Sequence, residues 1–413
     1  MLTASITTLP ASDSYSAAAG STSAPVSRAS VIHAAGQDRP SVRRVLLVTA
    51  RFFPDTGGVE THCYEVARRL AQAGVDVTVL ATARKPGLPA REVAEGVTIR
   101  RVPAWPADRD YYLAPGIWNV IREGNWDIVH VQGVHTLVAP LAMFAARMAR
   151  IPYVVTFHTG GNSSRLREAI RGVQWTVLHP LLAGAARLIG VSRFEARAFR
   201  DRLRLPTRRF AVIRNGAHLP PAPAVQERPP GTLLVSTGRL ERYKGHHRII
   251  SALPAILQQR PHTRLLILGA GPYEAELWRQ AQELGVAERV EIRAIPSADR
   301  VAMATAVASA DLVTLLSDYE AHPISVMESL ALKRPVLVAD TSGLRELAED
   351  GLVTAISLSS TPSEIAAAVL QQLEHPLVPT DVVLPTWEGC VAELQAVYND
   401  VVYARRTAAG RSS

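Results

Sequence analysis

Two glutamates in the second half of the chain are spaced so that both could act on one ligand. Glu320 and Glu328 stand eight positions apart, and the apolar spacing of residues 326–331 predicts a helix that begins between them. Glu320 should therefore lie in the loop before this helix, and Glu328 one to two turns inside it. A helix N-terminus favours an anionic ligand, because its first N–H groups point outward. We expect an anion there, with Glu328 in reach of a hydroxyl pair on the same ligand.

Two cations follow an expected strand earlier in the same half. Residues 233–237 form a short apolar run, and Arg239 and Lys244 lie in the loop between this run and an expected helix. Open α/β sheets bind their ligands at the carboxyl ends of parallel strands. A guanidinium offers a planar fork and an ammonium a point charge, and a diphosphate can use both. Taken alone, such cations usually belong to a solvated surface.

Three glycines and a histidine also lie in loops that follow expected strands. Gly57 and Gly58 separate a buried strand from a helix, a layout that brings backbone close to a phosphate or sugar, although an ordinary tight turn would look the same. His158 falls just past the end of another strand. Gly271 belongs to a Gly-x-Gly-Pro turn, and Glu274 stands where a dinucleotide fingerprint would need its third glycine. A nicotinamide or flavin site is therefore not expected.

The elements that carry these residues alternate between strand and helix. This alternation predicts an α/β fold with two doubly wound parallel sheets. We expect a disordered tail at 1–40, a first domain at 41–218, a proline-rich linker at 219–230, a second domain at 231–385, a C-terminal helix at 386–405 and a tail at 406–413.

Composition is that of a soluble globular protein of 413 residues, without an apolar run long enough for a transmembrane helix and without a recognisable secretory signal at 1–40. Cys63 and Cys390 are far apart, which predicts reduced thiols in a cytosolic protein. The net charge of +8 is uneven: residues 41–218 carry +13 and residues 219–413 carry −5. The first half should therefore face something anionic.

As an ordered set, these motifs resemble glycosyltransferase family 4, the retaining, nucleotide-sugar-dependent enzymes of the GT-B fold. The resemblance covers about residues 44–400. It implies two Rossmann-like domains facing a cleft and a C-terminal helix that returns to the first domain. The matching motifs are the E-x7-E signature at 320–328, Gly-Arg-Leu-x3-Lys-Gly at 238–245, Gly-Gly-x-Glu at 57–60, Gly-x-Gly-Pro at 269–272, Val191-Ser192, Asn215-Gly216 and the segment around Trp387.

The resemblance also implies roles for single residues. Glu320 would hold the transferred sugar near its anomeric centre, Glu328 would bind the ribose hydroxyls, and His158 would face the reacting sugar or acceptor. Arg239 and Lys244 would neutralise the departing diphosphate without a metal. The donor site would be completed by Gly57, Gly58, Gly271 and the backbone at Ile324 and Ser325.

Three positions depart from the family pattern. The signature's usual Glu-Gly-Phe-Gly is here Glu320-Ala-His-Pro323, so that proline removes one backbone N–H. Lys333 replaces the glycine that ends the signature helix, at a cost of about 1 kcal/mol if its backbone is left-handed. Gln132 replaces a second histidine, which leaves the role of the loop with His130 and His135 open.

The function we expect is transfer of a hexose-type sugar from a nucleotide-diphosphate sugar to a hydroxyl, with retention and no cofactor. The acceptor would be a lipid-linked glycan intermediate, since residues 165–214 hold twelve arginines and no lysine, a pattern suited to an anionic cytoplasmic membrane at the inner face of the plasma membrane. Solvated surface is the alternative for these arginines, and no nucleic-acid-binding module accompanies them.

Other functions stay open at this point. Asp108-Arg-Asp110 could hold a divalent metal in a transferase of the other major fold, although solvated loop carboxylates explain the pair as well. An epimerase or a phosphorylase could share the architecture, because fold does not fix function. A non-catalytic sugar-nucleotide-binding subunit is the remaining alternative.

Overall fold

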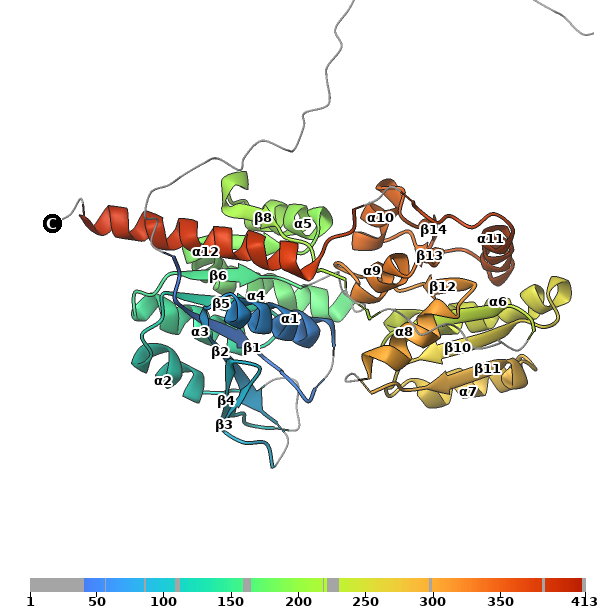
Figure 1. Ribbon diagram of the computed structural model, residues 1–413, viewed down its shortest axis with the longest axis horizontal. Helices are drawn as coiled ribbons and strands as arrows, with labels where there is room; N and C mark the ends of the chain where they lie inside the picture. Colours follow the sequence, from blue (N-terminus) through green and yellow to red (C-terminus); the bar gives the residue numbers. More distant parts are fainter. Residues whose placement is uncertain are drawn as a thin grey trace, which may run out of the picture. The chain divides into compact units, whose positions relative to one another are not determined.

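The computed structural model describes residues 41–55, 57–84, 87–107, 112–158, 165–217, 219–220, 230–296, 299–380 and 383–410. These residues form two parallel sheets, each covered by helices (Figure 1). The expected tail at 1–40 and most of the expected linker at 219–230 lie outside the described residues, and the boundaries of the domains stay predictions. Within the described ranges, no helix is long and apolar enough to span a membrane.

The first sheet contains eight described strands in the order β3-β4-β2-β1-β5-β6-β7-β8. All neighbours run parallel except β3 and β4. The strand order reverses between β1 and β5, and such a switch point is where open α/β sheets bind ligands. The strands are β1 (Arg44–Thr49), β2 (Asp76–Ala83), β3 (Arg91–Ala94), β4 (Val97–Pro103), β5 (Ile128–Gln132), β6 (Tyr153–Thr156), β7 (Arg187–Gly190) and β8 (Phe210–Val212).

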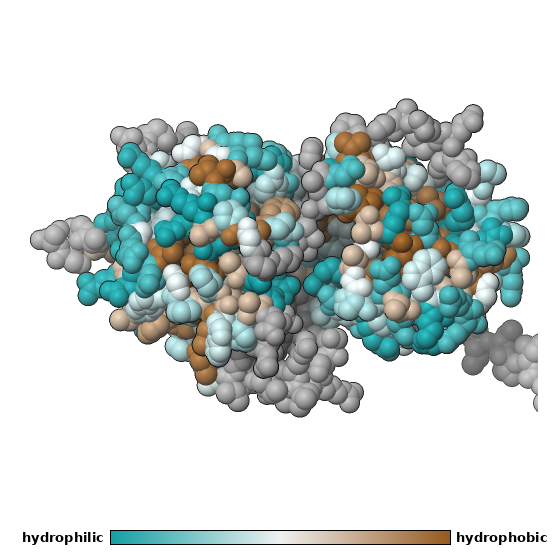
Figure 2. All heavy atoms as spheres, turned by 90° about the horizontal axis from the view of Figure 1, so that it is seen from below, coloured by the Kyte–Doolittle hydropathy of each residue, from teal (hydrophilic) through white to brown (hydrophobic). Residues whose placement is uncertain are grey.

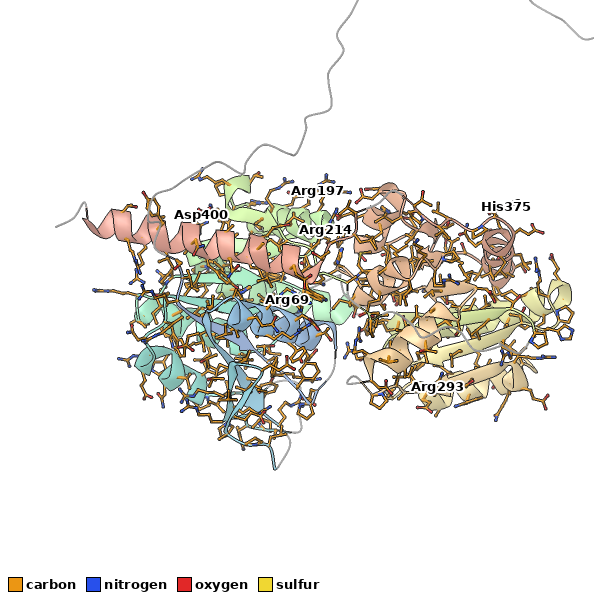
Figure 3. The ribbon with its side chains drawn as sticks, viewed as in Figure 1. Arg69, Arg197, Arg214, Arg293, His375 and Asp400 are labelled. Atoms are coloured by element: carbon orange, nitrogen blue, oxygen red, sulfur yellow. The ribbon has the colours of Figure 1, made fainter. Side chains whose placement is uncertain are left out.

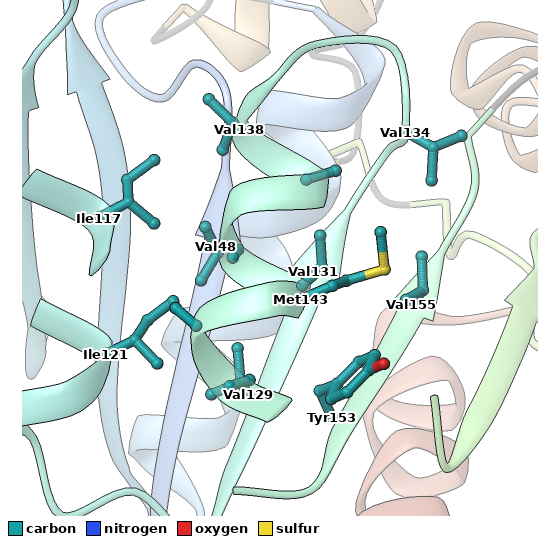
Figure 4. Close-up of a cluster of buried hydrophobic side chains, with 14 of the residues drawn as sticks. Val48, Ile117, Ile121, Val129, Val131, Val134, Val138, Met143, Tyr153 and Val155 are labelled. Carbon is teal, nitrogen blue, oxygen red and sulfur yellow. The ribbon is translucent and has the colours of Figure 1, made fainter. Parts of the chain in front are cut away.

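Helices cover this sheet because its central strands are apolar on both sides, as a buried parallel sheet requires. Figure 4 shows one layer of the core, in which Met143 of α3 (Val138–Met148) packs over strand residues such as Val131 and Val155. Ile117 and Ile121 of α2 (Gly116–Glu123) extend the same cluster. The other helices are α1 (Gly58–Gln72), α4 (Arg165–Gly184), α5 (Arg193–Leu203) and the 3-10 turn η1 (Thr207–Arg209).

The second sheet contains six described strands, all parallel, in the order β11-β10-β9-β12-β13-β14. Its order reverses between β9 and β12. The strands are β9 (Leu233–Thr237), β10 (Arg264–Leu268), β11 (Val290–Arg293), β12 (Leu312–Leu315), β13 (Val336–Ala339) and β14 (Thr354–Ile356). Its helices are η2 (Arg242–Lys244), α6 (His246–Gln259), α7 (Glu274–Glu283), η3 (Ala287–Arg289), α8 (Arg300–Ala308), α9 (Ile324–Ala331), α10 (Ser342–Glu349) and α11 (Pro362–Glu374).

The last helix, α12 (Trp387–Gly410), leaves the second sheet and packs on the first (Figure 1). Trp387, Leu394 and Tyr398 are buried in the same cluster as Leu47 and Leu70. Arg69 of α1 also donates to Glu388 at 2.8 Å. The predicted fold class, including the helix that returns to the first domain, is confirmed.

Ion pairs join α5 of the first half to α10 of the second. Arg193 and Arg214 both reach Glu346 and Asp350, with the shortest N–O distance of each arginine at 2.7 Å. Glu346 is buried, and it also accepts the backbone N–H of Phe194. Figure 3 labels Arg214 at this junction. These arginines are paired with acids inside the chain, so less of their charge acts on an external partner.

The turn after α9 shows how one departure from the family pattern is accommodated. Lys333 has a φ of +55°, and its N–H bonds the carbonyl of Leu330 while the N–H of Arg334 bonds that of Ser329. This left-handed helix end is the arrangement that normally selects glycine. The backbone of Lys333 is left-handed, which is the condition under which we expected strain there.

Replacing Lys333 by glycine should raise the free energy of unfolding by about 1 kcal/mol, because glycine has no Cβ to clash in the left-handed region. Urea denaturation monitored by circular dichroism would measure the change. Lys333→Ala is the matched control, since alanine removes the long side chain but keeps the Cβ. Equal stability of the glycine and alanine variants would contradict the prediction.

Candidate active site

The loop after β9 places Arg239 and Lys244 at the switch point of the second sheet. Its path is held by hydrogen bonds from Leu240 N–H to the carbonyl of Ala270 and from Tyr273 N–H to the carbonyl of Leu240. Gly271 belongs to this contact, because a Cβ there would lie 2.5 Å from the carbonyl oxygen of Leu240. Glycine is thus required for the two loops to approach each other. Gly271 supports the loop that carries the cations.

Lys244 forms an ion pair with Glu320, which follows β12 on the other side of the switch point. The Nζ–Oε1 distance is 2.6 Å, and Ser317 Oγ donates to the same oxygen at 2.9 Å. Both side chains are largely buried, with 17% and 12% of the side chain exposed. Burial lowers the pKa of Lys244, but Glu320 and the other nearby groups outweigh burial and the net pKa is raised. The ammonium therefore stays charged, and two of its three N–H groups remain for an anion.

Arg239 lies beside two stacked tyrosines. It donates to Tyr243 Oη at 2.6 Å and pairs with Glu241 at 2.9 Å. The ring of Tyr243 stacks on Tyr319 with centroids 4.7 Å apart and planes 5° apart. Half of the Arg239 side chain is exposed, so the guanidinium can exchange partners when a ligand arrives.

Helix α9 begins directly after this cluster and leaves its first N–H groups without a side-chain cap. Pro323 is the N-cap residue, so the missing proline N–H precedes the helix proper. The N–H groups of Ile324 and Ser325 remain at the open end of the helix, where an anion is favoured. Pro323 therefore removes fewer anion-binding N–H groups from the helix than the sequence suggested.

Glu328 lies one turn inside α9, as predicted, and forms an ion pair with Arg300 at the start of α8. Only 7% of Glu328 is exposed. Burial raises the pKa of Glu328 to about 7, although Arg300 acts in the opposite direction. Glu65 of α1 adds a small further increase, which places α1 of the first half close to this carboxylate.

The glycine loop of the first half also reaches the cations. Gly57 is the N-cap residue of α1 and Gly58 is its first residue. Glu60, two positions later, has a raised pKa, mainly from burial, while Arg239 of the second half and Arg51 lower it. Arg239 is thus close enough for its charge to act on the loop that follows β1. The charge of Arg239 therefore acts on the first turn of α1.

His158 lies two residues beyond the end of β6 and bonds Gln132 at the end of β5. The distance between His158 Nε2 and Gln132 Oε1 is 2.7 Å. Its ring meets that of His62 edge to face, with centroids 4.6 Å apart. His62 in turn bonds Asn215 at 2.9 Å, and Asn215 Nδ2 donates to the carbonyl of His322 in the signature loop.

Sequence reasoning missed several residues that the structure places here. Arg300 and His62 belong to no motif that we singled out, and their partners lie far away in the chain, whereas Tyr243 is one of the unspecified residues of the motif at 238–245. Only Tyr243 carried a signal, since it precedes Lys244 directly. Gln132 was noted as a departure, and the structure shows it beside His158. The predicted residues fall into one group at the second switch point and another at the first.

A metal site is the remaining question. Among the described residues, no three His, Cys, Asp or Glu side chains are arranged to hold a metal ion. Asp108 and Asp110 lie outside the described residues. Cys63 and Cys390 are both buried and unbridged.

Comparison with known families decides the classification. Residues 56–219 match the family model of Glycosyltransferase Family 4, and residues 223–382 match that of Glycosyl transferases group 1. Together these two models cover most of the chain, in the order in which the two sheets occur. The chain belongs to glycosyltransferase family 4.

Relatives of this family 4 glycosyltransferase extend over nearly the whole chain. The D-inositol 3-phosphate glycosyltransferase of Nocardiopsis dassonvillei is 29% identical over 83% of this chain and 90% of its own length. The phosphatidyl-myo-inositol mannosyltransferase of Mycobacterium leprae is 28% identical over 80% of this chain and 88% of its own length.

Solved GT-B structures share the fold of the family 4 chain. Sucrose-phosphate synthase from Thermosynechococcus elongatus superposes with a TM-score of 0.64 at 19% identity, over 90% of this chain and 98% of that one. Anabaena HepE in complex with UDP-glucose gives 0.63 at 19% identity, over 89% and 99%. At this identity the likeness concerns the fold.

Proposed function

We propose that this family 4 enzyme transfers a sugar from a nucleotide-diphosphate sugar to a hydroxyl with retention of anomeric configuration. The observation that carries the proposal is the Lys244–Glu320 ion pair at the switch point of the second sheet, next to Arg239 and the open end of α9. These groups combine cations and backbone donors for a leaving diphosphate with a carboxylate for a developing positive charge.

A residue or backbone group can be assigned to each step of the proposed transfer. The bond between the anomeric carbon and the diphosphate breaks, while Arg239, Lys244 and the first N–H groups of α9 stabilise the charge on the phosphate oxygens. Glu320 lies on the side where the sugar becomes positive. The acceptor oxygen bonds to the same face of the anomeric carbon, and its proton passes to a diphosphate oxygen. His158 orients a hydroxyl, and Glu328 binds the ribose.

The test is a turnover assay with purified protein and a panel of UDP-, GDP- and ADP-sugars, with the anomeric configuration of the product read by NMR. UDP-glucose is the first donor to try, because HepE was solved with it. Activity should persist in EDTA. An inverted product would overturn the proposed mechanism, loss of activity in EDTA would restore a metal mechanism, and epimerised or phosphorolysed donor would identify the alternative enzymes. Binding without any turnover would support a non-catalytic subunit.

For the acceptor, we propose a lipid-linked, anionic molecule at the inner face of the plasma membrane. The name of the Mycobacterium leprae relative points to a lipid acceptor for that protein. Of the arginines at 165–214, Arg193, Arg200 and Arg214 pair with acids inside the chain, and Arg209 bonds two carbonyl oxygens. The charge that this segment offers to a membrane is therefore smaller than its sequence suggested.

A surface formed by α3 and the end of α4 fits a membrane better. Phe144, Met148 and Val177 are exposed by 46%, 59% and 63%. Arg147 and Arg150 are exposed at the end of α3 and just after it, Arg147 donates to the carbonyl of Pro180 at 3.4 Å, and neither arginine pairs with an acid among the described residues. On the face drawn in Figure 2, hydrophobic side chains lie in small groups between hydrophilic ones.

The enzyme should sediment with anionic vesicles at low salt and less so at high salt. Changing both Arg147 and Arg150 to glutamate should weaken this binding by more than about 30-fold, because the loss of two contributions of about 1 kcal/mol each gives this factor and the added negative charges repel anionic lipid. The control is Arg260→Glu with Arg289→Glu, two arginines of the second half outside any described ion pair. If neither wild type nor control binds anionic vesicles, a soluble acceptor becomes the better proposal.

A further inference from the structure

The ends of β5 and β6 bring Gln132 and His158 together. Gln132 is the register partner of Thr156 in the parallel pair, and His158 follows two residues later. His158 has a φ of +58°, a left-handed backbone that is unfavourable for a residue with a Cβ. Such strain persists where surrounding contacts hold it. Here the imidazole is held against the side chain of Gln132.

His130, two residues earlier on β5, sets the orientation of the Gln132 amide. The amide nitrogen lies 3.2 Å from each ring nitrogen of His130 and therefore lies over the face of the imidazole, where the electron-rich ring favours an N–H group over a carbonyl oxygen. His130 itself is fully buried and bonds Tyr398 Oη at 2.6 Å and Thr156 Oγ1 at 2.7 Å. Because the amide nitrogen faces His130, the carbonyl oxygen must face His158.

This arrangement decides which nitrogen of His158 carries the proton. A carbonyl oxygen only accepts, so Nε2 of His158 must donate. In the neutral ring, Nδ1 then has a lone pair, and no partner for it occurs among the described residues. His62 cannot supply one, because the Oδ1 atom of Asn215 takes the N–H of its Nδ1, and its Nε2 has no partner.

We propose that Gln132 is a positioning residue. It holds His158 in the tautomer whose Nδ1 accepts a hydrogen bond from a hydroxyl of either substrate, the donor sugar or the molecule that receives it. The role of Gln132 rests on the proposed transfer function, and it explains why glutamine can replace the family's second histidine. A substrate hydroxyl that donates its hydrogen to Nδ1 leaves the lone pairs of its oxygen free for other contacts.

The surroundings keep the ring neutral. Burial lowers the pKa of His158 well below its ordinary value, and the groups that face it are His62 from α1, His130 from β5 and His135 from the loop after β5. All of them are histidines that disfavour a further positive charge. The acceptor form should therefore persist across the physiological pH range.

The decisive measurement is the tautomer of His158 in the intact, ligand-free protein, read by NMR of ¹⁵N-histidine-labelled samples and assigned with His158→Asn. We expect a proton on Nε2 and a bare Nδ1, without titration across the physiological pH range. Gln132→Leu should abolish this preference, whereas Gln72→Leu, an exposed glutamine of α1, should leave it unchanged. A proton on Nδ1 in the wild type would overturn the proposal. This measurement needs no substrate, so its failure is distinct from failure of the transfer function.

Kinetics give a second test. Gln132→Leu should lower kcat/KM about 10-fold, the factor that one well-placed hydrogen bond can supply, with donor affinity unchanged because the nucleotide is held by the second half. Gln132→Glu keeps an accepting oxygen but favours the imidazolium, so activity should now fall as pH drops through a raised pKa of His158. Wild-type kinetics in both variants would overturn the positioning role, even if one of them folded poorly.

Discussion

Replacing Lys244 by alanine, or Glu320 by glutamine, should lower turnover at least ~100-fold, the scale of losing one preorganised electrostatic partner. The two residues form one ion pair, with an N–O distance of 2.6 Å, in a largely buried setting. Removing the ammonium leaves the departing diphosphate short of a cation. Removing the carboxylate charge leaves the developing positive charge on the sugar uncompensated. A single-turnover assay at saturating donor would measure the chemical step.

Matched controls separate this effect from general damage. Arg260→Ala removes a cation of the second half, and Glu349→Gln neutralises a carboxylate at the end of α10. Both should keep turnover within about 2-fold, as changes outside special sites usually do. The double variant of Lys244 and Glu320 should lose less than the product of the single losses, since partners in contact do not act independently. Turnover near wild type in either single variant would contradict the assigned roles.

Donor affinity should fall about 10-fold between pH 8 and pH 6, because a carboxyl with a pKa of about 7 is almost fully ionised at the first pH and about one-tenth ionised at the second. Burial raises the pKa of Glu328, so its charged form is lost as pH falls through 7. The charged form is the better acceptor for two ribose hydroxyls. Calorimetric titration with an intact nucleotide sugar is the right measurement, since its diphosphate does not titrate in this range.

Two variants sharpen the pH prediction. Glu328→Gln should bind the donor weakly at every pH between 6 and 8. Arg300→Met should move the loss of affinity to higher pH, because Arg300 now lowers the pKa of Glu328. A wild-type affinity that does not change with pH, while Glu328→Gln binds weakly, would mean that the carboxyl stays ionised throughout. The contact with Arg300 would then outweigh burial.

Local patterns were enough to predict the two sheets and the placement of both glutamates. Glu320 precedes α9 and Glu328 lies inside it because the apolar spacing after Val326 could only suit a helix. Lys244 and Glu320 were each placed in a loop near the ends of the expected strands, but their contact was not predicted. That these strands, β9 and β12, adjoin at a switch point required the strand order, which the sequence pattern does not contain.

The remaining contacts depend on side chains that meet only after folding. Arg300 reaches Glu328 from another helix, and no spacing rule links them. In the sequence, Gln132 is only a replacement for a histidine of the family. Its proposed role depends on the amide orientation set by His130, which the sequence does not show. The arginines at 193 and 214 looked like part of a basic surface, yet they pair with Glu346 across the two halves. Charge counts along a chain cannot distinguish an internal partner from an external one.

The return of α12 to the first sheet has a consequence for the order of events during synthesis. Trp387, Leu394 and Tyr398 fill the core beside β1, and Tyr398 also bonds His130 under the candidate site. These residues leave the ribosome almost last, long after the strands that they cover. The N-terminal half therefore waits, with part of its apolar surface open, until the C-terminal half has been made. A late stop codon would damage the half that is most distant from it in the sequence.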